Sequence, residues 1–196
     1  MLNSRNIDHL RPDVATNCRV FLDLCAAQGL KVLITNTVRD DEYQAYLYAQ
    51  GRTRPGSIVT NAKKPSFHSD KAGLAFDICK NVKGQEYSDT EFFRACAQIG
   101  KAMGFEWGGD WKGFVDMPHF QWSGYNQEYA SSDIWVGRYP PQMPLYKKEE
   151  TNMNFEQALQ VLTNKGIIDS PEYWMKAGDC VTYFKDFVIK IAKAMN

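Results

Sequence analysis

The residues of this sequence best suited to chemistry are two histidines that each have aspartates near them. Of the three histidines in the chain, His68 is followed by Asp70 and Asp77, and His119 stands three residues after Asp116. Imidazole and carboxylate groups are good zinc ligands, and three protein ligands leave one coordination position for water. Zinc lowers the pKa of that water, and a nearby carboxylate can accept its proton. These residue types indicate a hydrolytic zinc site, although their spacing lacks the compactness of H-E-x-x-H.

Asp77 is the most informative of these acids because it lies within the apolar run GLAFDIC. A lone carboxylate is costly to bury there unless it is paired or bound to a metal. In a strand, Asp77 shares a face with Ala75 and Cys79. The thiolate of Cys79 is therefore a further possible ligand, and its ordinary alternative is a small core residue.

Each candidate also has a purely structural alternative. His68 can be a loop histidine bonded to Ser66, Asp77 can pair with Arg39, and His119 can be half-buried. Arg39 ends a strand-like run just before a helical segment, where a surface ion pair is the ordinary expectation. Its functional alternative is a cation that polarises a scissile carbonyl and stabilises the resulting oxyanion. Trp111 is the best candidate for a wall of the substrate cleft.

Periodicity and turn residues predict the elements that position these side chains. Helices are expected from Pro12 to Gly29, over 40–51, and over 88–104, where Ser88 and Glu91 form a capping-box pattern. Strands are expected over 30–38, over 73–80, and in the short segments FEWGG and HFQWS, and residues 52–65 are expected to form a loop. Helices and strands do not alternate regularly, so the fold class is α+β.

The composition is that of a globular protein with a small annex. A catalytic domain is expected over 1–137, a proline-rich linker over 138–153, and a small all-α domain over 154–196. That domain carries two apolar stripes at helical spacing, one that includes Leu159 and one that includes Val181 and Val188. The net charge is zero, which argues against a nucleic-acid partner. The five cysteines lack a C-x-x-C pair and are expected to be reduced. No membrane insertion and no cleaved leader are expected.

Four ordered segments, TNTVRDDEYQAYLYAQGRT, SFHSDKAGLAFDI, FEWGGDW and DMPHFQW, resemble zinc peptidases of the D-Ala-D-Ala carboxypeptidase (VanY-like) group. Within it they are most similar to the L-alanyl-D-glutamate endopeptidases among phage endolysins. The resemblance covers residues 5–125 and implies a small antiparallel sheet with flanking helices. It implies the following roles: His68, Asp77 and His119 as zinc ligands, Asp116 as general base, Arg39 as the carbonyl-polarising cation, and Ser66 and Gln44 as substrate contacts.

The chain departs from the family pattern at one place. Between His68 and Gly73 the segment SDKA is two residues longer than usual, so either the loop bulges and the ligands stay in place or Asp70 competes with Asp77 as a ligand. Asp77 is favoured because it holds the G-x-A-x-D position, whereas Asp70 lies in a turn-like stretch.

The resemblance implies hydrolysis of the stem peptide of bacterial peptidoglycan between L-Ala and D-Glu by a phage endolysin. Such an enzyme accumulates in the host cytoplasm until lysis and then reaches the wall. The small domain over 154–196 is expected to target the wall or to form oligomers. A D,D-carboxypeptidase or dipeptidase acting on D-Ala-D-Ala is the alternative with the same chemistry. A zinc-containing wall-binding module without catalysis is the alternative from another class, against which Asp116 and Arg39 argue.

Overall fold

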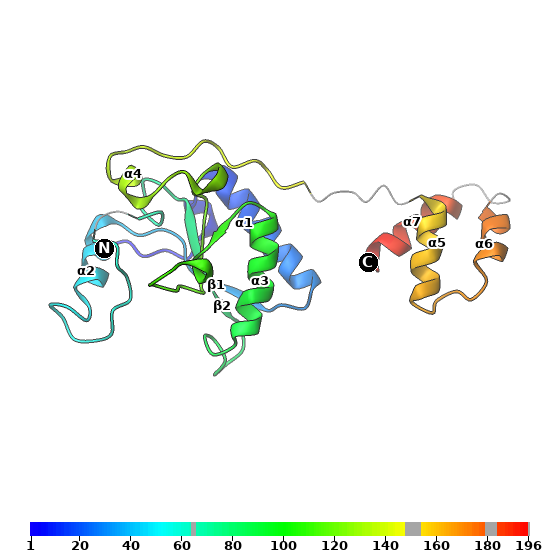
Figure 1. Cartoon of the computed structure of the whole chain (residues 1–196), viewed down its shortest axis with the longest axis horizontal. Helices are drawn as coiled ribbons and strands as arrows, with labels where there is room; N and C mark the ends of the chain where they lie inside the picture. Colours follow the sequence, from blue (N-terminus) through cyan, green and yellow to red (C-terminus); the bar gives the residue numbers. More distant parts are fainter. Residues whose placement is uncertain (64–65, 148–153, 179–183, 196) are drawn as a thin grey trace. The chain divides into compact units, whose positions relative to one another are not determined.

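The computed structural model describes residues 1–63, 66–147, 154–178 and 184–195 (Figure 1). The chain divides into two compact units, Met1–Tyr146 and Lys147–Asn196. The expected linker over 138–153 extends across this division, and part of it, residues 148–153, lies outside the described residues. The functional meaning of the division stays a prediction.

The first unit is built on a four-stranded antiparallel sheet in the order β1-β2-β4-β3. The strands are β1 (Val32–Asn36), β2 (Ala75–Lys80), β3 (Glu106–Trp107) and β4 (His119–Gln121). All four lie within the segments that the sequence predicts. With the helices around it, this sheet confirms the α+β fold class.

Helices and short 3-10 turns surround the sheet (Figure 1). In the first unit they are η1 (Ile7–His9), α1 (Pro12–Ala27), α2 (Asp41–Ala49), α3 (Thr90–Ala102), η2 (Gly108–Asp110), η3 (Tyr125–Gln127) and α4 (Ser131–Trp135). The three helices that the sequence predicts over 12–29, 40–51 and 88–104 are confirmed as α1, α2 and α3. Helix α4 was not predicted, because five residues are too few to show a helical period.

The sheet has a core face and a site face because side chains alternate along each strand. On the core face, Phe76 of β2 and Phe120 of β4 are paired in register and their rings stack at 5.5 Å. Phe21 of α1 packs on both, with ring centroids 5.5 and 5.2 Å away. All three rings are fully buried. The residues one position along, which include Asp77 and His119, therefore project from the opposite face.

Helix α3 begins differently from the prediction. Its N-cap is Asp89, whose carboxylate accepts a hydrogen bond from Phe92 N at 3.0 Å, so the expected capping box of Ser88 and Glu91 is wrong by one residue. Asp89 also accepts a hydrogen bond from Lys80 at the end of β2. This second contact favours the aspartate over the neighbouring serine as the cap.

The segment over 138–146 is held against α1 by hydrogen bonds. Arg11 donates to the carbonyl oxygens of Pro140 and Pro141, both at 2.8 Å. Asn17 of α1 donates to Pro144 O at 2.9 Å and accepts from Tyr146 N at 2.8 Å. The first half of the expected linker therefore belongs to the first unit.

The second unit contains α5 (Phe155–Asn164), α6 (Pro171–Gly178) and α7 (Phe184–Ala194). It has an apolar cluster of its own, which is formed by Phe155, Ala158, Leu159, Leu162, Val188 and Ala192. The apolar stripes expected around Leu159 and Val188 are thus buried together. Val181, which was assigned to the second stripe, lies outside the described residues. The role of the second unit in wall targeting or oligomerisation stays a prediction.

Two further expectations concern the whole chain. Cys18, Cys25, Cys79 and Cys96 are free thiols and buried, whereas Cys180 lies outside the described residues. Among the helices that the structure describes, none combines the length and apolar character needed to cross a bilayer.

Substituting Gly100 in α3 tests the packing of the core face. A Cβ at this position would lie 2.6 Å from the buried ring of Phe120. The clash costs about 1–3 kcal/mol, which outweighs the gain in helix propensity of about 1 kcal/mol. We expect Gly100→Ala to lower the free energy of unfolding, measured by urea denaturation. Gln98→Ala, on the exposed side of α3, is the control and should not lower it.

Candidate metal centre and active site

His68, Asp77 and His119 meet on the site face of the sheet. Asp77 and His119 are direct partners across the β2–β4 pair, so the strand register alone brings them together. His68 comes from the loop before β2. Backbone hydrogen bonds tie that loop to the end of β1, from Arg39 N to His68 O and from Asp70 N to Arg39 O.

The three candidate ligand atoms form an equilateral triangle. His68 Nε2, His119 Nδ1 and Asp77 Oδ1 are each 3.1 Å from the other two. Ligand atoms bound to zinc at about 2.0–2.1 Å in a tetrahedral arrangement lie roughly 3.3 Å apart. The triangle therefore has the size that one small metal ion requires.

The protonation of the two imidazoles also fits a cation. His68 Nδ1 donates to the carbonyl oxygen of Thr37 at 2.7 Å, and His119 Nε2 donates to Gln121 Oε1 at 2.9 Å. In the neutral rings, the nitrogens that face Asp77 then carry lone pairs. Two lone pairs and a carboxylate oxygen repel one another at this separation unless a positive charge lies between them. The donor set thus fits a divalent metal ion.

Burial and mutual charge shift the ionisation of all three groups. Burial lowers the pKa of His68 to about 4, which keeps this ring neutral at pH 7. Burial alone would raise the pKa of Asp77, but the charges and hydrogen bonds that the two imidazoles provide when they are protonated hold it well below its usual range. Burial likewise opposes the charged form of His119, whereas the hydrogen bond and charge of Asp77 raise its pKa. A proton and a metal ion therefore compete for the same position.

Arg39 reaches the site from the end of β1. Its Nε donates to Gln44 Oε1 at 2.6 Å, and its Nη1 donates to Asn36 Oδ1 at 3.1 Å. Burial lowers the pKa of the guanidinium, and the charges of Asp77 and Asp116 act in the opposite direction. An arginine held in this way presents a fixed positive charge beside the triangle.

Gln44 has a different place from the expected one. Its side chain is 2% exposed and does not line the cavity at the site. It accepts from Arg39 and donates to Ala62 O at 2.6 Å. In this structure Gln44 therefore positions the guanidinium and the loop that carries Ala62, and its expected contact with the substrate stays a prediction.

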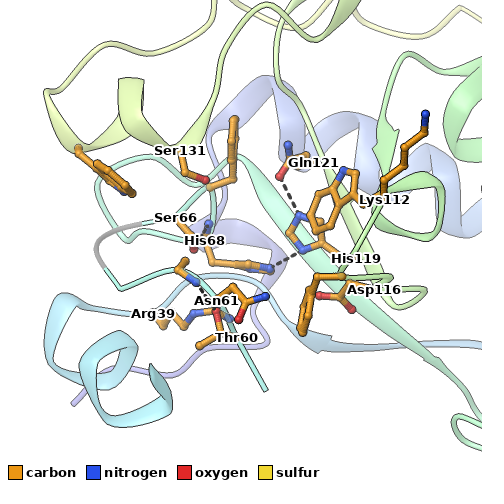
Figure 2. Close-up of a pocket in the computed structure, with 15 residues that line it drawn as sticks. Arg39, Thr60, Asn61, Ser66, His68, Lys112, Asp116, His119, Gln121 and Ser131 are labelled. Atoms are coloured by element: carbon orange, nitrogen blue, oxygen red, sulfur yellow. Dashed lines mark hydrogen bonds between the residues drawn. The ribbon is translucent and has the colours of Figure 1, made fainter. Parts of the chain in front are cut away.

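A cavity of about 410 Å³ opens over the triangle (Figure 2). Figure 2 shows His68 and His119 facing each other, with Asp116 below His119 and Arg39 on the far side of His68. The lining residues are Arg39, Thr60, Asn61, Ala62, Ser66, Phe67, His68, Trp111, Lys112, Phe114, Asp116, His119, Gln121, Ser131 and Trp135. The expected catalytic and cleft residues Asp116, Arg39, Ser66 and Trp111 are among them.

Asp116 is half-buried at the edge of this cavity. Burial raises its pKa above the ordinary value of an aspartate, and the negative charge of Asp77 adds to this effect, while His119 and Arg39 oppose it. A carboxyl group with a raised pKa is suited to accept and return a proton near neutral pH.

Gly108 allows the loop of Asp116 to approach the sheet. Asp116 N donates to Gly108 O at 3.0 Å, and a Cβ at position 108 would lie 2.5 Å from Asp116 O and 3.1 Å from His119 Cβ. At the neighbouring Gly109, a Cβ would lie 2.2 Å from the Trp107 ring. The two glycines of FEWGGDW are therefore required by close contacts.

Asp70 and Cys79 are the two other residues that the sequence offers as metal ligands. Among the described residues, the group that can share one metal ion consists of His68, Asp77 and His119, and it contains neither Asp70 nor Cys79. Asp70 is exposed in the turn that the extra residues form. Asp77 occupies the ligand position because only it is paired with His119 across the sheet.

Sequence reasoning missed several residues of the site. Thr60 and Asn61 line the cavity from the expected loop, and Trp135 comes from the unpredicted helix α4. Gln121 binds His119. The alternation within HFQ, which places His119 and Gln121 on one face of a strand, was the available signal for the last of these.

Comparisons with known proteins agree with this geometry. A family model described as D-alanyl-D-alanine carboxypeptidase matches residues 60–122. The peptidoglycan L-alanyl-D-glutamate endopeptidase CwlK of Bacillus subtilis is 38% identical over 123 residues, which cover 57% of this chain and 72% of that protein. The chain therefore belongs to the peptidase family that the D-alanyl-D-alanine carboxypeptidase model describes and that includes this endopeptidase.

Two further similarities are weaker in identity or cover less of the other protein. The L-alanyl-D-glutamate peptidase of Listeria phage A118 is 33% identical over 127 residues, which cover 63% of this chain but only 42% of the phage protein. The crystal structure of the L-Ala D-Glu endopeptidase ChiX of Serratia marcescens aligns with 62% of this chain and 88% of its own, at 19% identity and a TM-score of 0.41.

A substitution at Gly108 tests how the site of this family member is held together. We expect Gly108→Ala to displace the backbone of Asp116 and His119 and to weaken zinc binding by about 10–100-fold, as loss of a supporting contact does. The measurement is competition with a chromogenic chelator. Gly113→Ala is the control, because a Cβ there meets nothing within 4 Å although the backbone φ is positive. Equal zinc affinities of Gly108→Ala and the unmodified chain would show that the close approach at Gly108 does not hold the metal site together.

Proposed function

We propose that this chain is a zinc-dependent endopeptidase that hydrolyses the stem peptide of bacterial peptidoglycan at the L-Ala–D-Glu bond. The observation that carries the proposal is the triangle of His68, Asp77 and His119 beneath a cavity that also holds Asp116 and Arg39. Membership of the peptidase family and the names of the two relatives support the substrate. Two nitrogens and one carboxylate oxygen are a ligand set typical of catalytic zinc.

When bound, zinc supplies a Lewis acid that polarises the scissile carbonyl and makes a water molecule more acidic. The residues that would hold it are His68, Asp77 and His119. Thr37 and Gln121 keep the two imidazoles in the tautomers that such a metal needs. The chain thus presents a preorganised ligand set that does not have to rearrange on loading.

Asp116 is proposed as the group that moves the proton. Its carboxylate accepts a proton from the attacking water and passes it to the nitrogen of the leaving amine. The burial that raises its pKa brings proton affinity closer to that of the groups with which it exchanges. Peptide hydrolysis consumes one water and releases one new carboxyl end and one new amine, so this transfer completes the reaction.

Arg39 is proposed to stabilise the negative charge that develops on the carbonyl oxygen. Its guanidinium is held by Gln44 and Asn36, so it needs no reorganisation during the reaction. Ser66 and Trp111 line the same cavity and are proposed as substrate contacts. Gln44 is proposed as a positioning residue that acts through Arg39.

The biological setting that we propose is lysis of a bacterial host by a phage. The similarity to the Listeria phage peptidase supports this setting. The similarity to the Bacillus subtilis endopeptidase supports the same bond specificity in a bacterial context. Accumulation in the host cytoplasm before lysis is part of the proposal.

A second candidate function is removal of D-Ala from D-Ala-D-Ala ends, which the description of the matching family model favours. Mass spectrometry of purified muropeptides after digestion separates the two. We expect fragments with a new N-terminal D-Glu and no release of D-Ala. Release of D-Ala without new N-terminal D-Glu would establish the carboxypeptidase instead.

Asp116→Asn tests the proposed proton transfer. The amide keeps the shape of the side chain but cannot accept a proton, so we expect hydrolysis to fall by about 10²–10⁴-fold while zinc content per chain is retained. Turbidity loss of cell walls and elemental analysis measure the two quantities. His68→Ala is the matched comparison and should lose both zinc and activity. Wall lysis by Asp116→Asn at the unmodified rate would show that another group is the base.

A further inference from the structure

We propose that Glu106 is a positioning residue that determines, through Gln121, which nitrogen of His119 carries the proton, so that the nitrogen facing the metal position keeps its lone pair. The same carboxylate holds Trp111 at the wall of the cavity. The inference rests on the proposed function only for the identity of the metal. Its basis is a chain of hydrogen bonds on the site face of β3 and β4.

Glu106 and Gln121 are direct partners across the β3–β4 pair. Glu106 Oε2 accepts from Gln121 Nε2 and from Ser123 Oγ, both at 2.7 Å. Glu106 Oε1 accepts from the indole Nε1 of Trp111. Trp111 in turn lies against His119, with ring centroids 4.9 Å apart. One half-buried carboxylate thus connects the strand, the cavity wall and the ligand.

The direction of these hydrogen bonds follows from the chemistry of the carboxylate. An ionised carboxylate only accepts, so the amide nitrogen of Gln121 must face Glu106. The amide oxygen must then face His119 and accept from Nε2 at 2.9 Å. The proton of the neutral ring is thereby placed on Nε2, and the lone pair on Nδ1 faces Asp77 and His68. Reversing the amide would place the lone pair on the wrong side of the ring.

Replacing Glu106 by glutamine keeps the shape of the side chain but no longer fixes the direction of its hydrogen bonds with Gln121 and Trp111. The new amide offers one donor group, which meets the Nε2 donor of Gln121 or the Nε1 donor of Trp111. In the first case Gln121 must reverse, and its donor then opposes the Nε2 proton of His119. In the second case Trp111 loses its partner. The single variant therefore has a conflict either at His119 or at Trp111, whose ring lies against His119.

A reciprocal exchange removes the conflict. In E106Q/Q121E, the carboxylate at position 121 accepts from His119 Nε2 and from the amide nitrogen at position 106. That nitrogen also donates to Ser123 Oγ, and the amide oxygen accepts from Trp111. All partners are satisfied again with the charge moved from one strand to the next.

The test measures zinc dissociation constants of the full chain by competition with a chromogenic chelator. We expect E106Q to bind zinc about 10–100-fold more weakly and E106Q/Q121E to recover most of the lost affinity. In the zinc-loaded protein, the ring N–H of His119 should give an exchange-protected proton NMR signal in the unmodified chain and in the double variant. This signal should be absent or unprotected in E106Q.

Asp13→Asn is the matched control. Asp13 lies on α1, away from the cavity, and its carboxylate accepts from Arg11 and from Met143 N. Its substitution should lower the thermal unfolding midpoint but leave zinc affinity and the His119 signal unchanged. A parallel loss of zinc affinity in Asp13→Asn would mean that the effect of E106Q reflects general destabilisation, which would overturn the proposal.

Two results for the Glu106 variants would also overturn it: unchanged zinc affinity in E106Q, or a double variant as weak as the single one. If E106Q does not fold, the double variant decides alone, because it is expected to fold and to bind zinc. These readouts do not depend on peptidoglycan. A chain that shows the expected affinities but leaves muropeptides uncut would contradict the proposed function and keep the role of Glu106.

Discussion

The mutual repulsion of three electron-rich atoms is the constraint on which the rest of the structure depends. Two ring nitrogens and a carboxylate oxygen stand 3.1 Å apart in a mostly buried position. Such an arrangement is unfavourable without a cation or a proton between the atoms. It persists because the rigid parts of the fold fix each group separately. Two ligands are held by the register of β2 and β4, and the third is held by the loop bonded to the end of β1.

The core face of the sheet provides packing, and the site face carries the polar groups of the candidate metal centre. The core face carries stacked phenylalanine rings under α1, and the contact of Gly100 with Phe120 lets α3 pack closely. The site face carries polar pairs that match across strands, first Asp77 with His119 and then Gln121 with Glu106. Because each strand shares one backbone between the two faces, tight packing beneath the sheet also limits movement of the ligands above it. Stability and preorganisation of the site therefore have the same physical source.

Sequence patterns sufficed for the main elements, and the family resemblance pointed to the three residues that the structure brings together. Pro12 marks the first turn of α1, β-branched residues mark β1, and an aspartate inside an apolar strand singles out position 77. Partners across the sheet were not visible, since register depends on which strands become neighbours. For this reason Glu106 was not predicted to be near His119. For Gln44, the sequence does not show that the amide turns inward to Arg39. The cap of α3 was misassigned by one residue because Ser88 and Asp89 are both good caps and the contact with Lys80 decides between them.

The two imidazoles face the shared position with different nitrogens: His68 with the distal one and His119 with the one nearer its own backbone. The proximal nitrogen is separated from Cα by the same number of bonds as the side-chain oxygen of an aspartate or asparagine. An oxygen ligand at position 119 therefore needs a short side chain such as aspartate, whereas an oxygen ligand at position 68 needs the longer reach of glutamate or glutamine. More oxygen in the ligand set favours harder ions such as Mn²⁺ over zinc. The ion selectivity of this scaffold is consequently adjustable at both positions, with a side chain of a different length at each.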